Sequence, residues 1–201
     1  TTTGASILTD VEALSHASLF WRSFTHWIGG MGVLVFLLAV VQMSGGSNMN
    51  LMRAESPGPS VGKLVPKMRY TARILYILYF VLTALEIVFL VCGDMPVFDA
   101  VTASLGTAGT GGFGIKADSM ASYSTYVQWV ITIFMALFGV NFNFYYFLIF
   151  RQFGKALKME EVRAYFGVII FSIVAIVLNT YHLFDNLSEA ITHSAFQVAS
   201  I

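Results

Sequence analysis

The residues of this chain that could do chemistry are glycines and threonines in one short segment. Residues 106–114 read Gly-Thr-Ala-Gly-Thr-Gly-Gly-Phe-Gly, so five of nine positions are glycine. Glycine takes a positive φ at little cost, which allows successive backbone carbonyls to turn toward one point. A selectivity filter uses carbonyls in this way to replace the hydration shell of a potassium ion. A flexible outer loop is the alternative interpretation, because such residues are also common in loops.

A short apolar segment comes directly before these glycines. Residues 95–105 predict a helix with Pro96 in its first turn. The helix should end where the glycines begin, since each glycine in a helix costs about 1 kcal/mol relative to alanine. Both segments lie between longer apolar runs, and non-helical backbone at membrane depth must be buried in protein or line a water-filled path. The pattern therefore predicts a pore helix followed by a filter.

Composition predicts that these segments lie in a membrane. Of the 201 residues, 57% are hydrophobic and 11% charged, whereas a soluble domain carries about 25% charged residues. A membrane-spanning helix needs about 20 apolar residues. Four stretches have this length, at residues 18–43, 74–93, 126–150 and 164–181. The sequence therefore predicts an all-α membrane protein.

The charged residues predict how the chain crosses the membrane. Nine of the 11 Lys and Arg residues lie in loops 44–73 and 151–163, and the alternate segments are acidic. By the positive-inside rule both basic loops are cytoplasmic, in a multi-pass protein of the cell (inner or plasma) membrane. The acidic outer segments either attract cations to a pore or are ordinary outer loops. There is no basic face for nucleic acid, and the sole cysteine, Cys92, and four histidines lack transition-metal spacing.

The chain repeats its own pattern. Residues 99–104 (Asp-Ala-Val-Thr-Ala-Ser) are matched 90 residues later by residues 189–194 (Glu-Ala-Ile-Thr-His-Ser). The start of the chain, residues 1–6, resembles the glycine segment at 110–113. The repeated unit is a helix, a pore helix, a filter and a second helix, and the chain reads as the middle of something longer. Its predicted parts are 1–43 (filter and inner helix), 44–69 (cytoplasmic linker), 70–151 (a complete unit), 152–163 (cytoplasmic linker) and 164–201 (outer helix and pore helix).

These motifs resemble the Trk/Ktr/HKT superfamily of potassium transporters. Residues 20–32, with Phe-Trp-Arg-Ser and Trp-Ile-Gly-Gly-Met-Gly, look like the signature that follows its first filter. Thr110-Gly111-Gly112-Phe113 looks like its second filter, and Asn141-Phe142-Asn143 resembles the polar patch of the next helix. The family has four such units around one potassium-channel-like pore, so the resemblance implies a fragment with about two of them.

The resemblance also implies the ion-binding residues. The potassium-binding filter residues are Thr2, Thr3 and Gly4 in the first filter, and Thr110, Gly111, Gly112 and Phe113 in the second. Some relatives have Ser in the first filter and favour sodium, so Gly4 points to potassium. Filter support or cavity roles fall to Arg22, Asn141 and Asn143, and the two asparagines either face the cavity or bridge helices. The family implies a homodimer on a cytoplasmic nucleotide-binding regulatory ring, with K⁺ as the transported ion and no covalent cofactor.

Other residues keep two interpretations. Glu86 is an ionisable group in a predicted span, either functional or hydrogen-bonded between helices; its place on an outer helix favours the second. Arg22 either reaches the membrane surface or pairs with an acid behind the filter. Gly29, Gly30 and Gly32 predict close helix contact. The chain offers no set of enzyme residues. Potassium uptake is the leading prediction, beside a sodium-permeable or cation-coupled relative and a non-conducting membrane assembly subunit.

Overall fold

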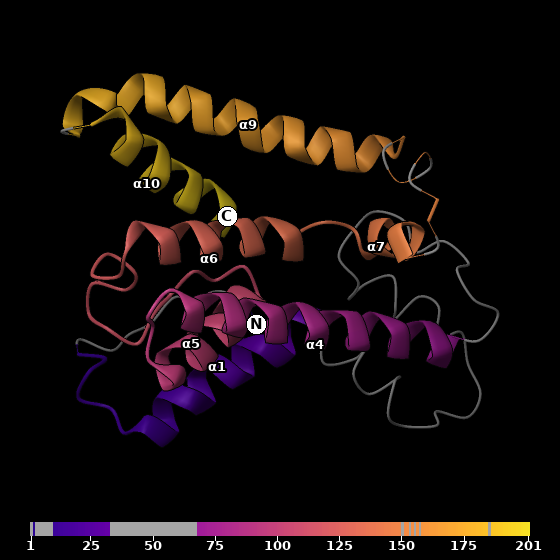
Figure 1. Cartoon of the computed structure of the whole chain (residues 1–201), viewed down its shortest axis with the longest axis horizontal. Coiled ribbons are helices and arrows are strands. Elements are labelled where there is room, and N and C mark those ends of the chain that lie inside the picture. Colours follow the sequence, from indigo (N-terminus) through magenta and orange to yellow (C-terminus); the bar gives the residue numbers. More distant parts are fainter. Residues whose placement is uncertain are drawn as a thin grey trace.

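The computed structural model describes residues 2, 10–32, 68–149, 151–152, 154, 156, 158–184 and 186–201. This part of the chain is helical and contains no strand. Its elements are α1 (His16–Met31), α4 (Met68–Cys92), α5 (Val97–Thr107), α6 (Thr125–Phe138), α7 (Phe142–Ile149), α9 (Glu160–Thr180), η1 (Tyr181–Leu183) and α10 (Leu187–Ser200) (Figure 1). The all-α prediction is therefore confirmed for the described residues.

Two helices are long and apolar enough to cross a membrane. They cover Ile74–Cys92 and Glu160–Leu183, and both run along the long axis of the molecule (Figure 1). Only 11% of the most apolar window of the second is buried. Its exposed side chains include Phe171 at 75% and Leu178 at 70%. A core helix of a soluble protein would bury such side chains, so this surface suits contact with lipid.

The third predicted span is not one helix. Residues 126–150 were expected to be continuous, but α6 ends at Phe138 and α7 begins at Phe142. The Gly139 N–H bonds to the Met135 carbonyl, and the hydroxyl of Tyr145 donates to the carbonyl of Leu137. The Leu137 carbonyl also accepts from the Val140 N–H, so the Tyr145 hydroxyl adds a side-chain donor to the backbone bonds at the end of α6. This interruption is invisible in the hydropathy, because the residues on both sides are apolar.

The predicted short helix is present as α5. Pro96 is its N-cap residue, in agreement with the expected position of the proline at the helix start. The helix continues through Gly106 to Thr107, two residues beyond the predicted end. Thr107 donates its side-chain hydroxyl to the Ala103 carbonyl at 2.9 Å, and the Gly106 carbonyl accepts a bond from the Gly111 N–H. Tertiary burial of this turn outweighs the low helix propensity of one glycine.

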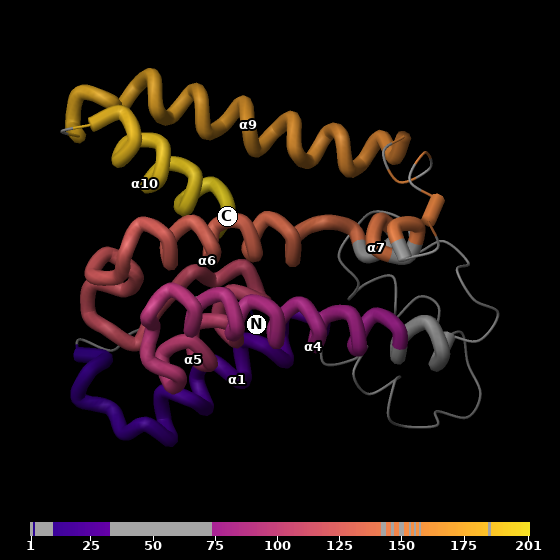
Figure 2. The backbone as a smooth tube through the Cα atoms, in the orientation of Figure 1, coloured from indigo at the N-terminus to yellow at the C-terminus, as the bar shows by residue number. Residues whose placement is uncertain are grey.

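The sequence repeat corresponds to a repeat of packing. Helix α5 packs on α1 and α4, and α10 packs in the same way on α6 and α9. Both short helices lie near the same end of the molecule (Figure 2). Thr102 and Thr192 each donate to the carbonyl four residues earlier, at 2.9 Å in both cases. The matched positions Ala100 and Ala190 are both fully buried. Residues 99–104 and 189–194 therefore occupy equivalent positions in two similar arrangements.

Several helices begin at other residues than the predicted boundaries of the units and linkers. Helix α4 begins at Met68, two residues before the predicted unit at residue 70. Helix α9 begins at Glu160, so residues 160–163 of the predicted linker are helical. The second half of the first predicted span and most of the linker 44–69 lie outside the described residues.

Candidate functional site

The glycine segment forms a buried loop between α5 and α6. Residues 108–110 make a turn, and residues 111–114 have no regular secondary structure. Thr110 and Gly112 both have a positive φ, of 58° and 62°. The Thr110 N–H bonds to the carbonyl of Thr107 at 2.7 Å, so the loop is tied to the last turn of α5. The positive φ of Gly112 agrees with the prediction that some glycines here adopt φ > 0, whereas the positive φ of Thr110 falls on a residue that adopts it less readily.

The carbonyls of this loop fall into two groups. The Gly109 carbonyl accepts from the Thr110 hydroxyl at 2.7 Å, and the Gly112 carbonyl has a long contact of 3.4 Å with the Ser119 hydroxyl. By contrast, no hydrogen bond from another described residue reaches the carbonyls of Thr110 and Gly111. Two consecutive carbonyls therefore keep their acceptor capacity, as cation coordination requires.

Helix α1 supports the loop through His26. The His26 Nε2 atom lies 3.2 Å from the Gly109 carbonyl oxygen, and its ring packs edge-on against Phe113 with centroids 4.9 Å apart. A Cβ at Gly109 would overlap the imidazole, and one at Gly111 would lie 2.7 Å from Nε2. The sequence pattern alone indicates no site role for His26. Its position four residues after Arg22, on the same face of a helix, was the signal that could have revealed it.

Arg22 also reaches the loop. Its guanidinium lies 4.3 Å from the ring centroid of Phe113 and donates to the Gly114 carbonyl at 3.3 Å. No acidic side chain among the described residues pairs with Arg22, so the interpretation of an acidic partner behind the filter is not supported by them. The Arg22 guanidinium therefore supports the end of the loop at Phe113 and Gly114 through a cation–π contact and a hydrogen bond, without an ion pair.

Gly30 allows α1 to approach both the loop and α4. A Cβ at Gly30 would overlap the hydroxyl of Tyr79 and would lie 3.0 Å from the Ala108 carbonyl oxygen and the Gly109 Cα. The Tyr79 hydroxyl donates to the Trp27 carbonyl of α1 at 2.9 Å. The close contact predicted for this glycine is therefore confirmed, and it involves the loop as well as a helix.

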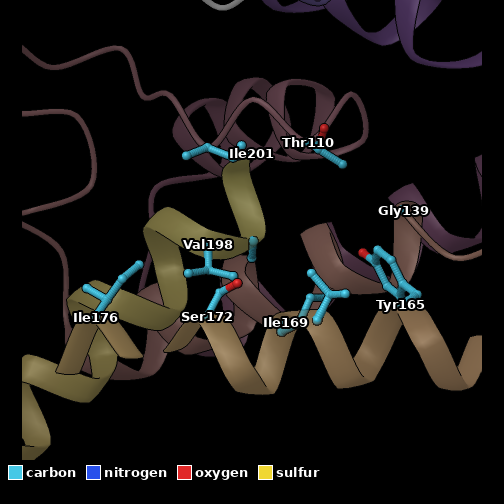
Figure 3. Close-up of a pocket in the computed structure, with 10 residues that line it drawn as sticks. Thr110, Gly139, Tyr165, Ile169, Ser172, Ile176, Val198 and Ile201 are labelled. Atoms are coloured by element: carbon cyan, nitrogen blue, oxygen red, sulfur yellow. The ribbon is translucent and has the colours of Figure 1, made fainter. Parts of the chain in front are cut away.

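Two cavities flank the loop. One, of about 280 Å³, is lined by Gly111, Gly112 and Phe113 together with polar groups that include Asp118 and His193. The other, of about 570 Å³, contains Thr110 and lies against apolar side chains of α9 and α10 (Figure 3). Figure 3 also places Tyr165 and Gly139 at this second cavity. The loop therefore separates a polar cavity from a largely apolar one.

The segment after the loop is fixed by polar contacts at its surface. The Gly114 N–H bonds to the Ser119 hydroxyl at 3.0 Å. The Tyr123 hydroxyl donates to the Asp99 carboxylate at 2.7 Å, and Lys116 lies 4.2 Å from the Tyr123 ring centroid. Burial and the Asp99 carboxylate raise the pKa of the Tyr123 phenol, so it remains a hydrogen-bond donor at neutral pH.

The structure describes only some of the remaining predicted site residues. Asn141 donates from Nδ2 to the Glu161 carboxylate at 2.7 Å, which joins the α6–α7 break to the first turn of α9 and agrees with the helix-bridging interpretation. Thr2 is exposed and lies outside any helix. Thr3, Gly4 and the side chain of Asn143 lie outside the described residues. The first predicted filter therefore stays a prediction.

A family comparison matches the whole chain. The family is TrkH, described as a cation transport protein, and the match covers residues 1–201. The chain is 34% identical to the Trk system potassium uptake protein TrkH of Salmonella typhimurium and 33% identical to that of Escherichia coli K12. Each alignment covers 100% of this chain and 43% of the relative. The chain thus spans less than half the length of these relatives.

A solved structure has the same fold. The crystal structure of the potassium transporter TrkH from Vibrio parahaemolyticus aligns with a TM-score of 0.78 at 27% sequence identity. The alignment covers 99% of this chain and 41% of that protein.

Proposed function

Because this chain belongs to the TrkH family of cation transport proteins, we propose that it forms part of a potassium-uptake pore in the cell membrane, with residues 110–113 as one selectivity filter. The family is one of transporters rather than enzymes, and its members are membrane proteins. The proposal assigns this chain potassium as its transported ion, as the names of its relatives state for those proteins.

The observation that carries this proposal is the state of the loop carbonyls. Thr110 and Gly111 present two consecutive carbonyls without hydrogen bonds from other described residues, next to backbone with alternating sign of φ. These residues lie at the boundary of two cavities, with Thr110 on one side and Gly111 on the other. An ion that passed from one cavity to the other along this loop would meet both carbonyls. Carbonyl oxygens are the ligands that replace water around potassium in a filter.

The surrounding contacts suit a filter that must keep its shape. Arg22 lies over the Phe113 ring and His26 packs against it edge-on, and each also contacts a backbone carbonyl, of Gly114 and Gly109 respectively. A carbonyl filter needs such support because like dipoles that point at one site repel each other once the ion leaves. The polar cavity contains Asp118, whose charge would favour entry of cations from that side.

The rest of the assembly follows from the family resemblance. We propose that Thr2, Thr3 and Gly4 form a further filter, and that residues 70–151 make one complete unit between partial units at 1–43 and 164–201. Loops 44–73 and 151–163 would then face the cytoplasm in a multi-pass topology. A homodimer and a cytoplasmic nucleotide-binding ring are the expected partners, and the basic loops would lie nearest that ring.

Ion flux through the full-length protein in proteoliposomes tests the proposal. We expect potassium uptake to exceed sodium uptake, and Gly112→Ser to reduce this preference. At Gly112 a side chain must adopt a positive φ, and its Cβ would lie 3.0 Å from the Met135 sulfur. Gly167→Ser is a matched control, because a Cβ at Gly167 would meet no atom of another described segment within 4 Å.

The outcomes separate the alternatives. Flux of neither ion through the intact protein would leave a non-conducting assembly subunit, and equal flux of both would favour a sodium-permeable relative. A folded Gly112→Ser protein with unchanged preference would mean that residues 110–113 are an ordinary loop.

A further inference from the structure

One carboxyl group is buried in the apolar core beside the candidate filter. Glu86 lies on α4 and is 0% exposed. It belongs to an inward stripe with Tyr79, Thr83 and Leu90, each at most 5% exposed. The neighbouring Leu85 and Val88 are exposed at 46% and 58%, so the helix turns its only acidic residue inward and its apolar residues outward. This reverses the ordinary distribution, in which charged side chains are almost never fully buried without a partner.

No cation among the described residues compensates this carboxyl. Helix α5 carries one titratable group, Asp99, and α6 carries only Tyr126. On α1, Arg22 is engaged with Phe113 and Gly114. On α4 itself, Tyr79 donates to the carbonyl of Trp27. An isolated ionised carboxylate is very costly in such surroundings, so this group requires hydrogen bonds.

The available hydrogen-bonding groups lie on one face of α5. The Glu86 carboxyl is next to the Thr107 hydroxyl. Thr107 gives its proton to the Ala103 carbonyl at 2.9 Å, which leaves the hydroxyl oxygen able to accept. Ser104 lies one turn earlier on the same face, and its buried hydroxyl has no partner among the described residues. The two Glu86 oxygens are the other buried side-chain atoms without one.

One arrangement satisfies these groups together. A protonated Glu86 donates its O–H to the Thr107 oxygen, and its carbonyl oxygen accepts from the Ser104 hydroxyl after small side-chain rotations. We propose that Glu86, in this neutral form, is a positioning residue that fastens the last turn of α5 to α4 and thereby maintains the ion selectivity of the loop. This inference rests on the proposed function of residues 110–113.

The connection from Glu86 to the loop is short. Thr107 is the last residue of α5, and its carbonyl accepts the Thr110 N–H at 2.7 Å. The Ala108 N–H bonds to the Ser104 carbonyl at 3.0 Å. Both residues of α5 that the proposal pairs with Glu86 therefore also hold the start of the loop backbone. A shift of this turn would move the Thr110 and Gly111 carbonyls relative to the rest of the pore.

Three variants of the full-length protein test this inference by their potassium-to-sodium uptake ratio. Glu86→Leu keeps the bulk but removes both hydrogen bonds, and we expect the ratio to fall about fivefold or more, the equivalent of one buried hydrogen bond. Glu86→Gln keeps one donor and one acceptor, so its ratio should stay within about twofold of wild type. Thr107→Val removes the acceptor from the other side and should reproduce the effect of Glu86→Leu.

A matched control separates positioning from general destabilisation. Thr83→Val removes a buried hydroxyl on the same face of α4 that accepts from Trp27 of α1 and donates to the Tyr79 carbonyl of α4. It should lower thermal stability and leave the uptake ratio unchanged. Infrared spectroscopy gives a second readout: the band of a protonated carboxyl should disappear in Glu86→Gln.

The results that would overturn the inference are distinct. Folded Glu86→Leu and Thr107→Val proteins with the wild-type ratio would reject it, as would a Glu86→Gln variant as impaired as Glu86→Leu. Absence of the protonated carboxyl band would reject it even if Glu86→Leu fails to fold. A wild-type protein without potassium preference would instead refute the proposed function, and the infrared result would still report on Glu86.

Discussion

Gly30→Ala tests whether the contact between α1 and the loop is as close as the structure indicates. In an isolated helix this change stabilises by about 1 kcal/mol, because alanine is the better helix former. Here the new methyl group would overlap the Tyr79 hydroxyl and would lie 3.0 Å from the Ala108 carbonyl oxygen and the Gly109 Cα. The tertiary structure therefore predicts the opposite sign from the helix propensity.

The magnitude follows from two costs. Overpacking in a filled interior costs about 1–3 kcal/mol. Movement of Tyr79 away from the methyl group would also break its 2.9 Å bond to the Trp27 carbonyl, a loss of about 1 kcal/mol. After the gain in helix propensity, we expect Gly30→Ala to destabilise the protein by about 1–3 kcal/mol.

Thermal unfolding of the full-length protein in detergent measures this effect, together with potassium uptake. Gly167→Ala is the control, since its Cβ would meet no atom within 4 Å in the other described parts of the chain, and it should be neutral or stabilising. Tyr79→Phe removes the overlapping hydroxyl, so the double variant should recover part of the stability lost in Gly30→Ala. If Gly30→Ala stabilises as much as Gly167→Ala, the packing of α1 on the loop is not as described.

Three further predictions concern other contacts of the site. His26→Leu should lower stability by about 1–3 kcal/mol through loss of the loop-carbonyl and aromatic contacts, and it should also reduce ion selectivity. His26→Gln can still donate a hydrogen bond, so it should retain more stability and more selectivity in the same unfolding and uptake assays. Asn141→Leu leaves the partly buried Glu161 carboxylate without the 2.7 Å donor and should cost about 1–3 kcal/mol in thermal unfolding; an unchanged midpoint would contradict this. Tyr123→Phe removes the 2.7 Å hydrogen bond to Asp99 and should lower the free energy of unfolding by about 1 kcal/mol, while uptake at neutral pH is largely kept. A loss of selectivity as large as that of His26→Leu would show instead that the segment after the loop shapes the filter.

Much of the local structure could be predicted from the sequence alone. Hydropathy predicts the spans that correspond to α4 and α9, because a run of about 20 apolar residues can be recognised without knowledge of tertiary contacts. Pro96 predicts the start of α5, and the glycine-rich segment predicts its end to within two residues, because backbone propensity is a local property. The match between residues 99–104 and 189–194 anticipates the equivalent packing of α5 and α10. The family resemblance was likewise available from short motifs.

Other features depended on contacts between distant residues. The break between α6 and α7 has no hydropathy signal, and the Tyr145 hydroxyl reaches the Leu137 carbonyl across this interruption. One interpretation of Arg22 pairs it with an acid and the other places it at the membrane surface, whereas in the structure it contacts an aromatic ring and a carbonyl 92 residues away. His26 gained its role only through the approach of Gly109 from another segment.

The sequence by itself determined which segments are apolar helices, where the glycines allow a positive φ, and to which family the pattern is similar. These properties follow from side-chain chemistry and backbone sterics at each position. Only the tertiary structure decided which loop carbonyls receive no hydrogen bond from another described residue, which side chains of α1 support the loop, and that the Glu86 carboxyl lies next to Thr107. Such relations depend on distances between residues far apart in the chain, and the order of the amino acids does not state those distances.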